Sequence, residues 1–204
     1  RARRCTRMMD AEGPALDLLR RSLSEAWAER QEGVFRLLGL LHPPDAIYRA
    51  FLAISGGERT SRANAIEWLE ETLERPLFDR IAPVLGELPP ADEPDPFVSL
   101  GVLLRDGDPW IARTALAATA EIGAPWSRAV LHDIIGAEPP GEIAELARRH
   151  LGEEPEPEET MDLIEKVFLL QKIDLLRDAR SSHLALLASI AEEGRMFPLA
   201  RHQE

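Results

Sequence analysis

Histidines and clustered carboxylates are the side chains of this sequence that are best suited to chemistry, as metal ligands or as acid–base pairs. The five histidines are His42, His132, His150, His183 and His202. None has the His-x-x-x-His spacing that puts two imidazoles on one helix face, so no local zinc site is predicted. We expect His132 and His150 to be partly exposed helix residues rather than a metal pair across a hairpin, because two ligands are too few.

Three carboxylates, Glu67, Glu70 and Glu71, lie close together on one predicted helix. Acid–base catalysis needs carboxylates whose surroundings push their pKa values apart, and a solvated helix face does not do this. The sequence also has no Gly-x-Ser-x-Gly elbow, and no Lys-Ser or Lys-Thr follows Gly56-Gly57 to make a phosphate-binding loop. The sequence therefore predicts no enzyme, no cofactor and no metal.

The charge balance bears on the class of partner. The formal net charge is −12, which argues against a nucleic-acid groove because phosphate binding needs clustered Lys and Arg. Four arginines cluster at residues 1–7, where a solvated arm is favoured over contact with an anionic surface. Cys5 is the only cysteine, so no intrachain disulfide is predicted. Apolar runs such as Leu37–Leu41 are too short to span a bilayer, and a cytoplasmic location is expected.

Apolar residues recur with a helical period along most of the chain, and aromatic residues make up only 5% of it. The predicted helices are residues 14–41, 45–54, 61–73, 77–88, 97–104, 108–123, 127–135, 141–151, 161–171 and 182–192. Arg30 and Gly33 interrupt the apolar stripe of the first helix, so the sequence allows a kink or break there. Pro83 is expected to bend or restart its helix. On residues 61–73, one face is predicted to carry Ala63, Ile66, Leu69 and Leu73.

A repeat is visible around one strong helix start. Asp108 is a preferred N-cap and Pro109 a preferred first helical residue, while Gly123 is suited to end the helix. Ile122-Gly123 and Leu151-Gly152 are 29 positions apart, since 151 − 122 = 29, and the same offset relates two alanine pairs. Those pairs are Ala115 with Ala144 and Ala118 with Ala147. This repetition predicts stacked helical hairpins, with the alanines near the interface.

The segment 108–123 resembles the second helix of a HEAT repeat. The pattern is carried by the Asp-Pro turn, by Ile111, by Arg113 two positions later, by Ala115 and by the closing Ile122-Gly123. Residues 127–152 and 45–73 match it less fully. The resemblance implies an all-α fold, a HEAT-like α-solenoid of stacked helical hairpins.

A second resemblance covers residues 33–88. The stretches Val-Phe-Arg-Leu-Leu-Gly-Leu-Leu-His-Pro-Pro from Val34 and Arg-Ala-Asn-Ala-Ile-Glu-Trp-Leu from Arg62 resemble the HEAT-like region of bacterial nucleotide-transporter-like (ADP/ATP antiporter-like) membrane proteins. Residues 161–176 and 183–193 are similar to the lead-in helices of a cyclic-nucleotide-binding domain. They depart from that pattern at Asp174 and at Asp178-Ala179-Arg180, and the β-barrel with its phosphate cassette is absent from the sequence. No cyclic-nucleotide binding is therefore expected of this chain.

These patterns predict three regions. They are a basic arm and long helix at 1–43, HEAT-like repeats at 44–152 with an acidic, proline-rich linker at 89–96, and a lead-in region at 160–204. The expected function is a non-catalytic protein-interaction or regulatory scaffold, which couples a transporter-like membrane domain to a ligand-sensing domain at the inner face of the membrane. A structural linker without a partner is the alternative, and an uncharacterised enzyme is the third. We expect Trp110 and Trp126 as partner contacts and Trp27 and Trp68 as core residues.

Overall fold

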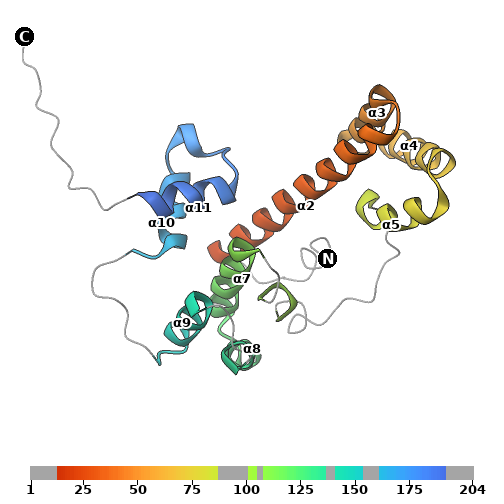
Figure 1. The fold of residues 1–204 in the computed structure, drawn as a ribbon. Coiled ribbons are helices and arrows are strands. Elements are labelled where there is room, and N and C mark those ends of the chain that lie inside the picture. Colours follow the sequence, from red (N-terminus) through yellow and green to blue (C-terminus); the bar gives the residue numbers. More distant parts are fainter. Residues whose placement is uncertain (1–12, 87–100, 105–107, 137–140, 154–160, 192–204) are drawn as a thin grey trace, which may run out of the picture.

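The computed structural model describes five stretches of chain: residues 13–86, 101–104, 108–136, 141–153 and 161–191. Every regular element within these stretches is a helix, and no strand occurs among them, which confirms the prediction of an all-α fold (Figure 1). The arginine cluster at residues 1–7, predicted as a basic arm, and the acidic linker at 89–96 lie outside the described residues. So do the first four residues of the predicted helix 97–104 and the chain after residue 191.

The longest element is α2 (Pro14–Leu41), an uninterrupted helix of 28 residues. Its first free amides are capped from another helix, because the Glu121 carboxylate accepts from the backbone N–H groups of Ala15 and Leu16, both at 3.0 Å. A Cβ on Gly13 would lie 2.3 Å from this carboxylate, so a side chain there would displace the cap. The helix does not break at Gly33, since one helix runs through it.

Three helices gather at the C-terminal end of α2 (Figure 1). They are α3 (Pro44–Gly56), α4 (Arg59–Thr72) and α5 (Arg75–Leu85). Pro83 lies inside α5, which continues as one helix to Leu85 rather than restarting. At the end of α5, the Val84 carbonyl accepts from the Gln31 side chain, and the Leu85 carbonyl accepts from the Arg62 side chain.

These helices and the second half of α2 share a buried apolar cluster, the second core. Its residues are Phe35, Leu38, Ile47, Ala50, Ile54, Ala65, Ile66, Leu69, Leu73, Phe78, Ile81 and Leu85. The predicted inner face of α4 is correct at Ile66 and Leu69 but wrong at Ala63, which is exposed while Ala65 is buried. The predicted face is therefore wrong only at Ala63, and Leu73, which follows α4, is buried as predicted.

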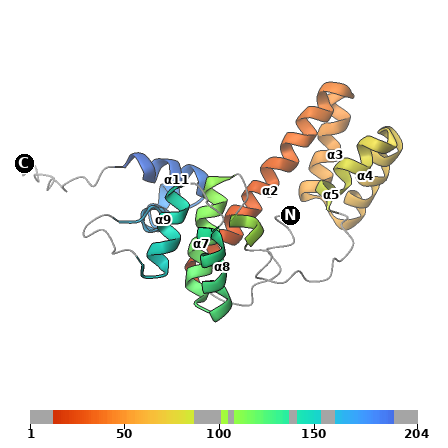
Figure 2. The same ribbon diagram turned by 60° about the horizontal axis from the view of Figure 1, so that its bottom comes forward.

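The first half of α2 packs on a second group of helices, α7 (Pro109–Ile122), α8 (Pro125–Gly136) and α9 (Gly141–His150) (Figure 2). Their shared cluster is the first core. Its residues are Leu16, Leu19, Leu23, Leu103, Leu104, Ile111, Ala112, Ala115, Leu116, Ala118, Val130, Leu131, Ile134, Ile143, Leu146 and Ala147. Alanines on α7 and α9 are buried because small side chains let neighbouring helices approach closely.

Two left-handed glycines end α7 and α9 in the same way. Gly123 has φ 60° and Gly152 has φ 76°, a conformation that glycine adopts without steric cost. Each donates its N–H to the carbonyl three residues earlier, Ala120 at 3.2 Å and Arg149 at 2.9 Å. Both hydrophobe-Gly pairs that are 29 positions apart in the sequence therefore lie at the C-terminus of a helix.

The C-terminal unit consists of α10 (Leu163–Gln171), the 3₁₀ turn η1 (Asp174–Leu176) and α11 (Ser181–Ile190). A capping box starts α10, in which the Asp162 side chain accepts from a backbone N–H and Glu165 reaches back to the N–H of Asp162. Leu18 of α2 joins this unit in a third core. The other buried members are Ile164, Val167, Leu184, Ala185 and Ala188.

All three cores meet on α2, which supplies residues to each of them. The predicted boundary at residue 43 falls between α2 and α3, two helices that share the second core. The long helix is thus the common support of the helical groups along the chain.

Candidate interaction surface

A groove runs between the C-terminal half of α2 and α3. Pro43 and Pro44 set its geometry, because α2 ends at Leu41 and Pro44 starts α3 at once, which turns the chain back within two residues. The hollow between the two helices has a volume of about 440 Å³. It is lined by Glu32, Phe35, Arg36, Gly39, Leu40, Pro44, Ile47, Tyr48 and Phe51. Gly39 leaves the α2 wall without a side chain, which widens the groove opposite Pro44.

Aromatic rings make up the α3 side and the base of this groove. The Phe35 and Phe51 rings lie 5.4 Å apart between centroids and are tilted by 52°, and Tyr48 lies 6.5 Å from Phe51. Tilted pairs at such distances are favourable aromatic contacts. On the α2 side, Arg36 and Glu32 form an ion pair at 2.6 Å, which leaves that rim with no net charge. The groove thus presents an apolar, aromatic lining with a neutral rim.

Large apolar side chains continue from the groove onto the surrounding surface. Five of them, exposed by half or more, form what we call the α2–α3 patch: Leu37, Leu40, Leu41, Tyr48 and Leu52. Leu40 is 81% exposed and Tyr48 is 60% exposed, although both line the groove. Single exposed apolar residues are ordinary, but exposed Leu40 and Tyr48 at the edge of an apolar groove indicate a surface that contacts another molecule.

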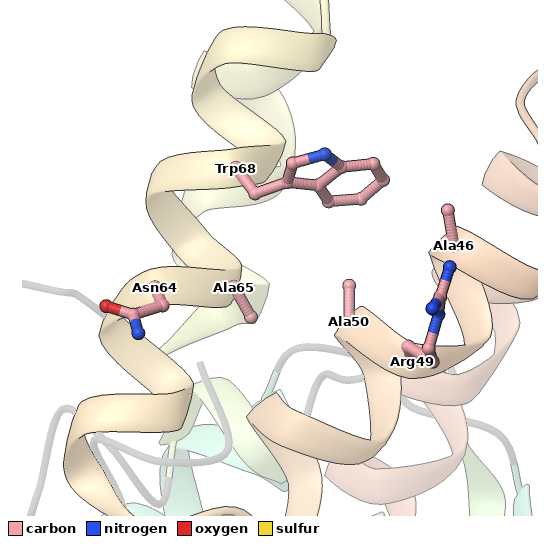
Figure 3. A pocket seen from close by; sticks show the side chains of 6 residues that line it. All are labelled: Ala46, Arg49, Ala50, Asn64, Ala65 and Trp68. Atoms are coloured by element: carbon pink, nitrogen blue, oxygen red, sulfur yellow. The ribbon is translucent and has the colours of Figure 1, made fainter.

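A shallower cleft lies on the other side of α3, between α3 and α4 (Figure 3). Ala46 and Ala50 on α3 and Ala65 on α4 are small, and the space beside them, about 320 Å³, lies under the Trp68 ring. The Trp68 ring extends from α4 toward α3, where Arg49 stands beside Ala46. Trp68 was predicted as a core residue, but its ring is half-buried against the second core and lines this cleft.

The two tryptophans predicted as partner contacts are both partly buried. The indole N–H of Trp110 donates to the hydroxyls of Ser22 and Ser181, both at 3.1 Å. Trp126 is half-buried against the first core, as is Trp27. The Trp110 N–H is therefore used within the chain, and neither ring is among the exposed large apolar side chains.

The Trp110 contacts belong to a polar junction that joins α2, α7 and α11. Ser181 donates from its backbone N–H and from its hydroxyl to one Glu25 oxygen, at 2.7 and 2.6 Å. Since the only hydroxyl proton of Ser181 is used there, Ser22 is the donor in the 3.0 Å contact between the two hydroxyls. A serine beside a carboxylate resembles a nucleophile with its base. Ser181 is 0% exposed, however, so no substrate reaches it in this conformation, and the junction holds α11 on α2.

Arg21 completes the junction. Its Nε pairs with the second Glu25 oxygen at 2.9 Å, and its guanidinium donates to the carbonyl of Ala179 at 2.6 Å, just before α11. No local sequence pattern predicts this junction, because Arg21 and Ala179 are far apart in the chain. One signal was available: Ser22 interrupts the apolar stripe of α2 between Leu19 and Leu23.

The predicted repeat positions lie on α7 and α9. The Asp108 carboxylate accepts from the backbone N–H groups of Trp110 at 2.9 Å and Ile111 at 3.3 Å, with Pro109 between them as the first helical residue. Arg113 is only 12% exposed and forms ion pairs with Glu142 and, at 3.6 Å, with Asp162. Both of these acids lie outside α7, on α9 and at the start of α10. The alanine positions are all buried: Ala115, Ala118, Ala144 and Ala147.

The residues considered for chemistry are dispersed. His132 is exposed and lies 4.0 Å from Glu153, while His150 lines a separate hollow of about 440 Å³ with Arg128. Glu70 pairs with Arg75 at 2.6 Å on an exposed surface. Among the described residues, no group of three or more His, Cys, Asp or Glu side chains is placed to hold a metal ion. Within the same residues, no helix has the length and apolar character that crossing a membrane requires.

Comparisons with known proteins leave the chain without an assigned family. No family model matches it, no curated protein matches its sequence, and no solved structure matches its fold.

Proposed function

We propose that this chain is a non-catalytic interaction scaffold that binds another protein surface through the α2–α3 patch. The observation that carries the proposal is the combination of the patch with the aromatic groove beneath Leu40 and Tyr48. An apolar, neutral groove of this kind suits the apolar face of an amphipathic helix. A structural linker without a partner is expected to have a uniformly mixed surface, so the patch favours the scaffold.

We further propose that α7 and α9 are equivalent helices of a HEAT-like solenoid. Arg113 pairs with Glu142, which lies one 29-residue offset later, and this is the contact expected of equivalent positions on parallel, stacked helices. The matching left-handed caps at Gly123 and Gly152 support the same relation. Solenoids leave extended surfaces free for binding, which agrees with a scaffold role.

The identity of the partner is proposed from the second resemblance. The residues from Val34 and from Arg62 that resemble the transporter-like family lie on α2, α3 and α4, where the patch and the Trp68 cleft are found. On this proposal the patch contacts a transporter-like membrane domain, and the C-terminal helices lead to a ligand-sensing domain. The scaffold then lies at the cytoplasmic face of the membrane.

A photocrosslinking experiment tests the proposed contact. Benzoylphenylalanine replaces Leu40 in the protein expressed in its own cells. After irradiation, the peptides crosslinked to this residue are identified by mass spectrometry. We expect products from one membrane-domain segment, and we expect Tyr48→Glu to remove them. The control places the same crosslinker at Glu67, an exposed position on α4. Scattered products that are the same from both positions would refute the proposal.

A further inference from the structure

The cleft between α3 and α4 is bounded by a flat aromatic ring and by alanine methyl groups. Figure 3 shows the Trp68 ring extending from α4 toward α3, with Ala65 and Ala50 below it. Ala50 and Ala65 are buried, and Ala46 lies one turn before Ala50 on the same helix. Because these side chains are small, a hollow of about 320 Å³ stays open under the ring. A slot of this shape fits a flat apolar group, which can stack on the indole.

Among the described residues that line this cleft, Arg49 is the only charged one. Its Nε donates to the backbone carbonyl of Asp45, one turn earlier on α3, at 3.3 Å. Within the part of the chain that the structure describes, Arg49 makes no other hydrogen bond and no ion pair. The two terminal nitrogens of its guanidinium are therefore open to a ligand, and their planar arrangement matches a carboxylate. The cleft thus favours an anion, although the whole chain has a net charge of −12.

The ring and the cation lie on opposite helices of the same hollow. In Figure 3, Arg49 stands at the α3 edge of the hollow, on the side toward which the Trp68 ring points. A flat group that stacks under the ring can therefore carry its charged end to the guanidinium. The indole N–H of Trp68 also has no hydrogen-bond partner among the described residues, so the ring is not held by a polar contact of its own.

We propose that the cleft between α3 and α4 binds a small aromatic carboxylate. Its flat group stacks between the Trp68 ring and the alanine methyl groups, and its carboxylate pairs with Arg49. The cleft and the α2–α3 patch lie on different sides of α3, and the proposal does not depend on the function assigned to that patch. The hollow, about 320 Å³, is near the lower end of the roughly 300–1,000 Å³ of ligand pockets, so weak binding is expected, with a Kd of about 1 mM.

Titration of the purified chain with cinnamate tests this site, and the indole N–H signals of its four tryptophans are followed by NMR. The Trp68 signal is assigned by its loss in Trp68→Phe. We expect cinnamate to shift this signal to saturation, while the signals of the other three tryptophans stay in place. Cinnamyl alcohol has the same flat group without the charge, and it is expected to bind about fivefold more weakly, the order of effect of a partly exposed ion pair.

Three variants separate the contributions of charge and shape. Arg49→Gln is expected to weaken cinnamate binding about fivefold and to leave cinnamyl alcohol unchanged. Arg80→Gln is the matched control, because it removes the same charge from an exposed position on α5, and it is expected to change neither affinity. Ala46→Leu fills the hollow, so both ligands should lose binding. Circular dichroism checks that each variant stays folded.

A Trp68 signal that does not move with cinnamate up to about 20 mM, well above the expected Kd, would overturn the proposal. Equal affinities for cinnamate and cinnamyl alcohol would overturn it as well, and so would cinnamate binding that Arg49→Gln leaves unchanged. An equal loss in Arg49→Gln and Arg80→Gln would contradict it too, because the charge effect would then be general rather than local. Crosslinking results at Leu40 can fail without affecting these outcomes.

Discussion

At the scale of single residues, Asp108 stabilises the start of α7 as an N-cap, since its carboxylate accepts from two backbone N–H groups while Arg113 pairs elsewhere. Asp108→Ala is expected to lower the free energy of unfolding by about 1 kcal/mol. Because the capped groups are backbone amides, the loss should persist in molar salt, which screens ion pairs. Urea unfolding at low and high salt measures it, with the exposed Asp133→Ala as control. A loss that vanishes in molar salt would show that an ion pair, not the cap, is the larger contribution.

The Glu25 carboxylate is the centre of the polar junction, where it accepts from the N–H and hydroxyl of Ser181 and pairs with Arg21. Hydrogen bonds to a charged group contribute about 1.5–3 kcal/mol, so Glu25→Gln is expected to loosen α11 by that order. Hydrogen exchange of the α11 amides measures this, and the rates should rise. Glu29→Gln is the control, because Glu29 is exposed one turn further along α2 and lies 4.0 Å from Arg180. Equal effects of the two substitutions would contradict a specific role of the junction.

At the scale of elements, α2 passes Gly33 without a break, and a Cβ at Gly33 would meet no neighbouring atom within 4 Å. Gly33→Ala is therefore expected to stabilise the protein by roughly 0.5–1 kcal/mol, because glycine has more conformational freedom to lose in a helix. Gly123→Ala should destabilise it, since the left-handed conformation at φ 60° strains any side chain. Thermal unfolding of both variants checks the pair. A lower melting temperature for Gly33→Ala would mean that α2 needs a flexible point there.

The elements themselves were largely predictable from local signals. Pro14 and Pro44 fix the start of α2 and of α3, while Asp108-Pro109 and Gly123 bound α7, because these residues act on their own backbone. The predictions were wrong where tertiary packing, rather than the local sequence, determines the structure. Gly33 is helical because both halves of α2 are buried in cores, and Ala65 replaces Ala63 on the inner face because α4 packs against α3.

At the scale of the whole molecule, the sequence predicted the helical class but not how the helices assemble around α2. The caps between helices join residues such as Leu16 and Glu121, 105 positions apart, and Ser181 and Glu25, 156 apart. No local pattern relates residues at such separations. The groove was missed for the same reason: Leu40 and Tyr48 are ordinary apolar residues in the sequence, and they form one surface only because α3 folds back along α2.

The central claim is that the α2–α3 patch is covered by another protein surface, and carbene footprinting tests it most directly. Labelling of Leu40 and Tyr48 is compared between the isolated chain and the gene product at its natural length in its own cells. The account predicts strong labelling of both side chains in the isolated chain and several-fold weaker labelling in the cell, with no change at exposed Glu67 on α4. Equal labelling of Leu40 and Tyr48 in the two states would contradict the claim.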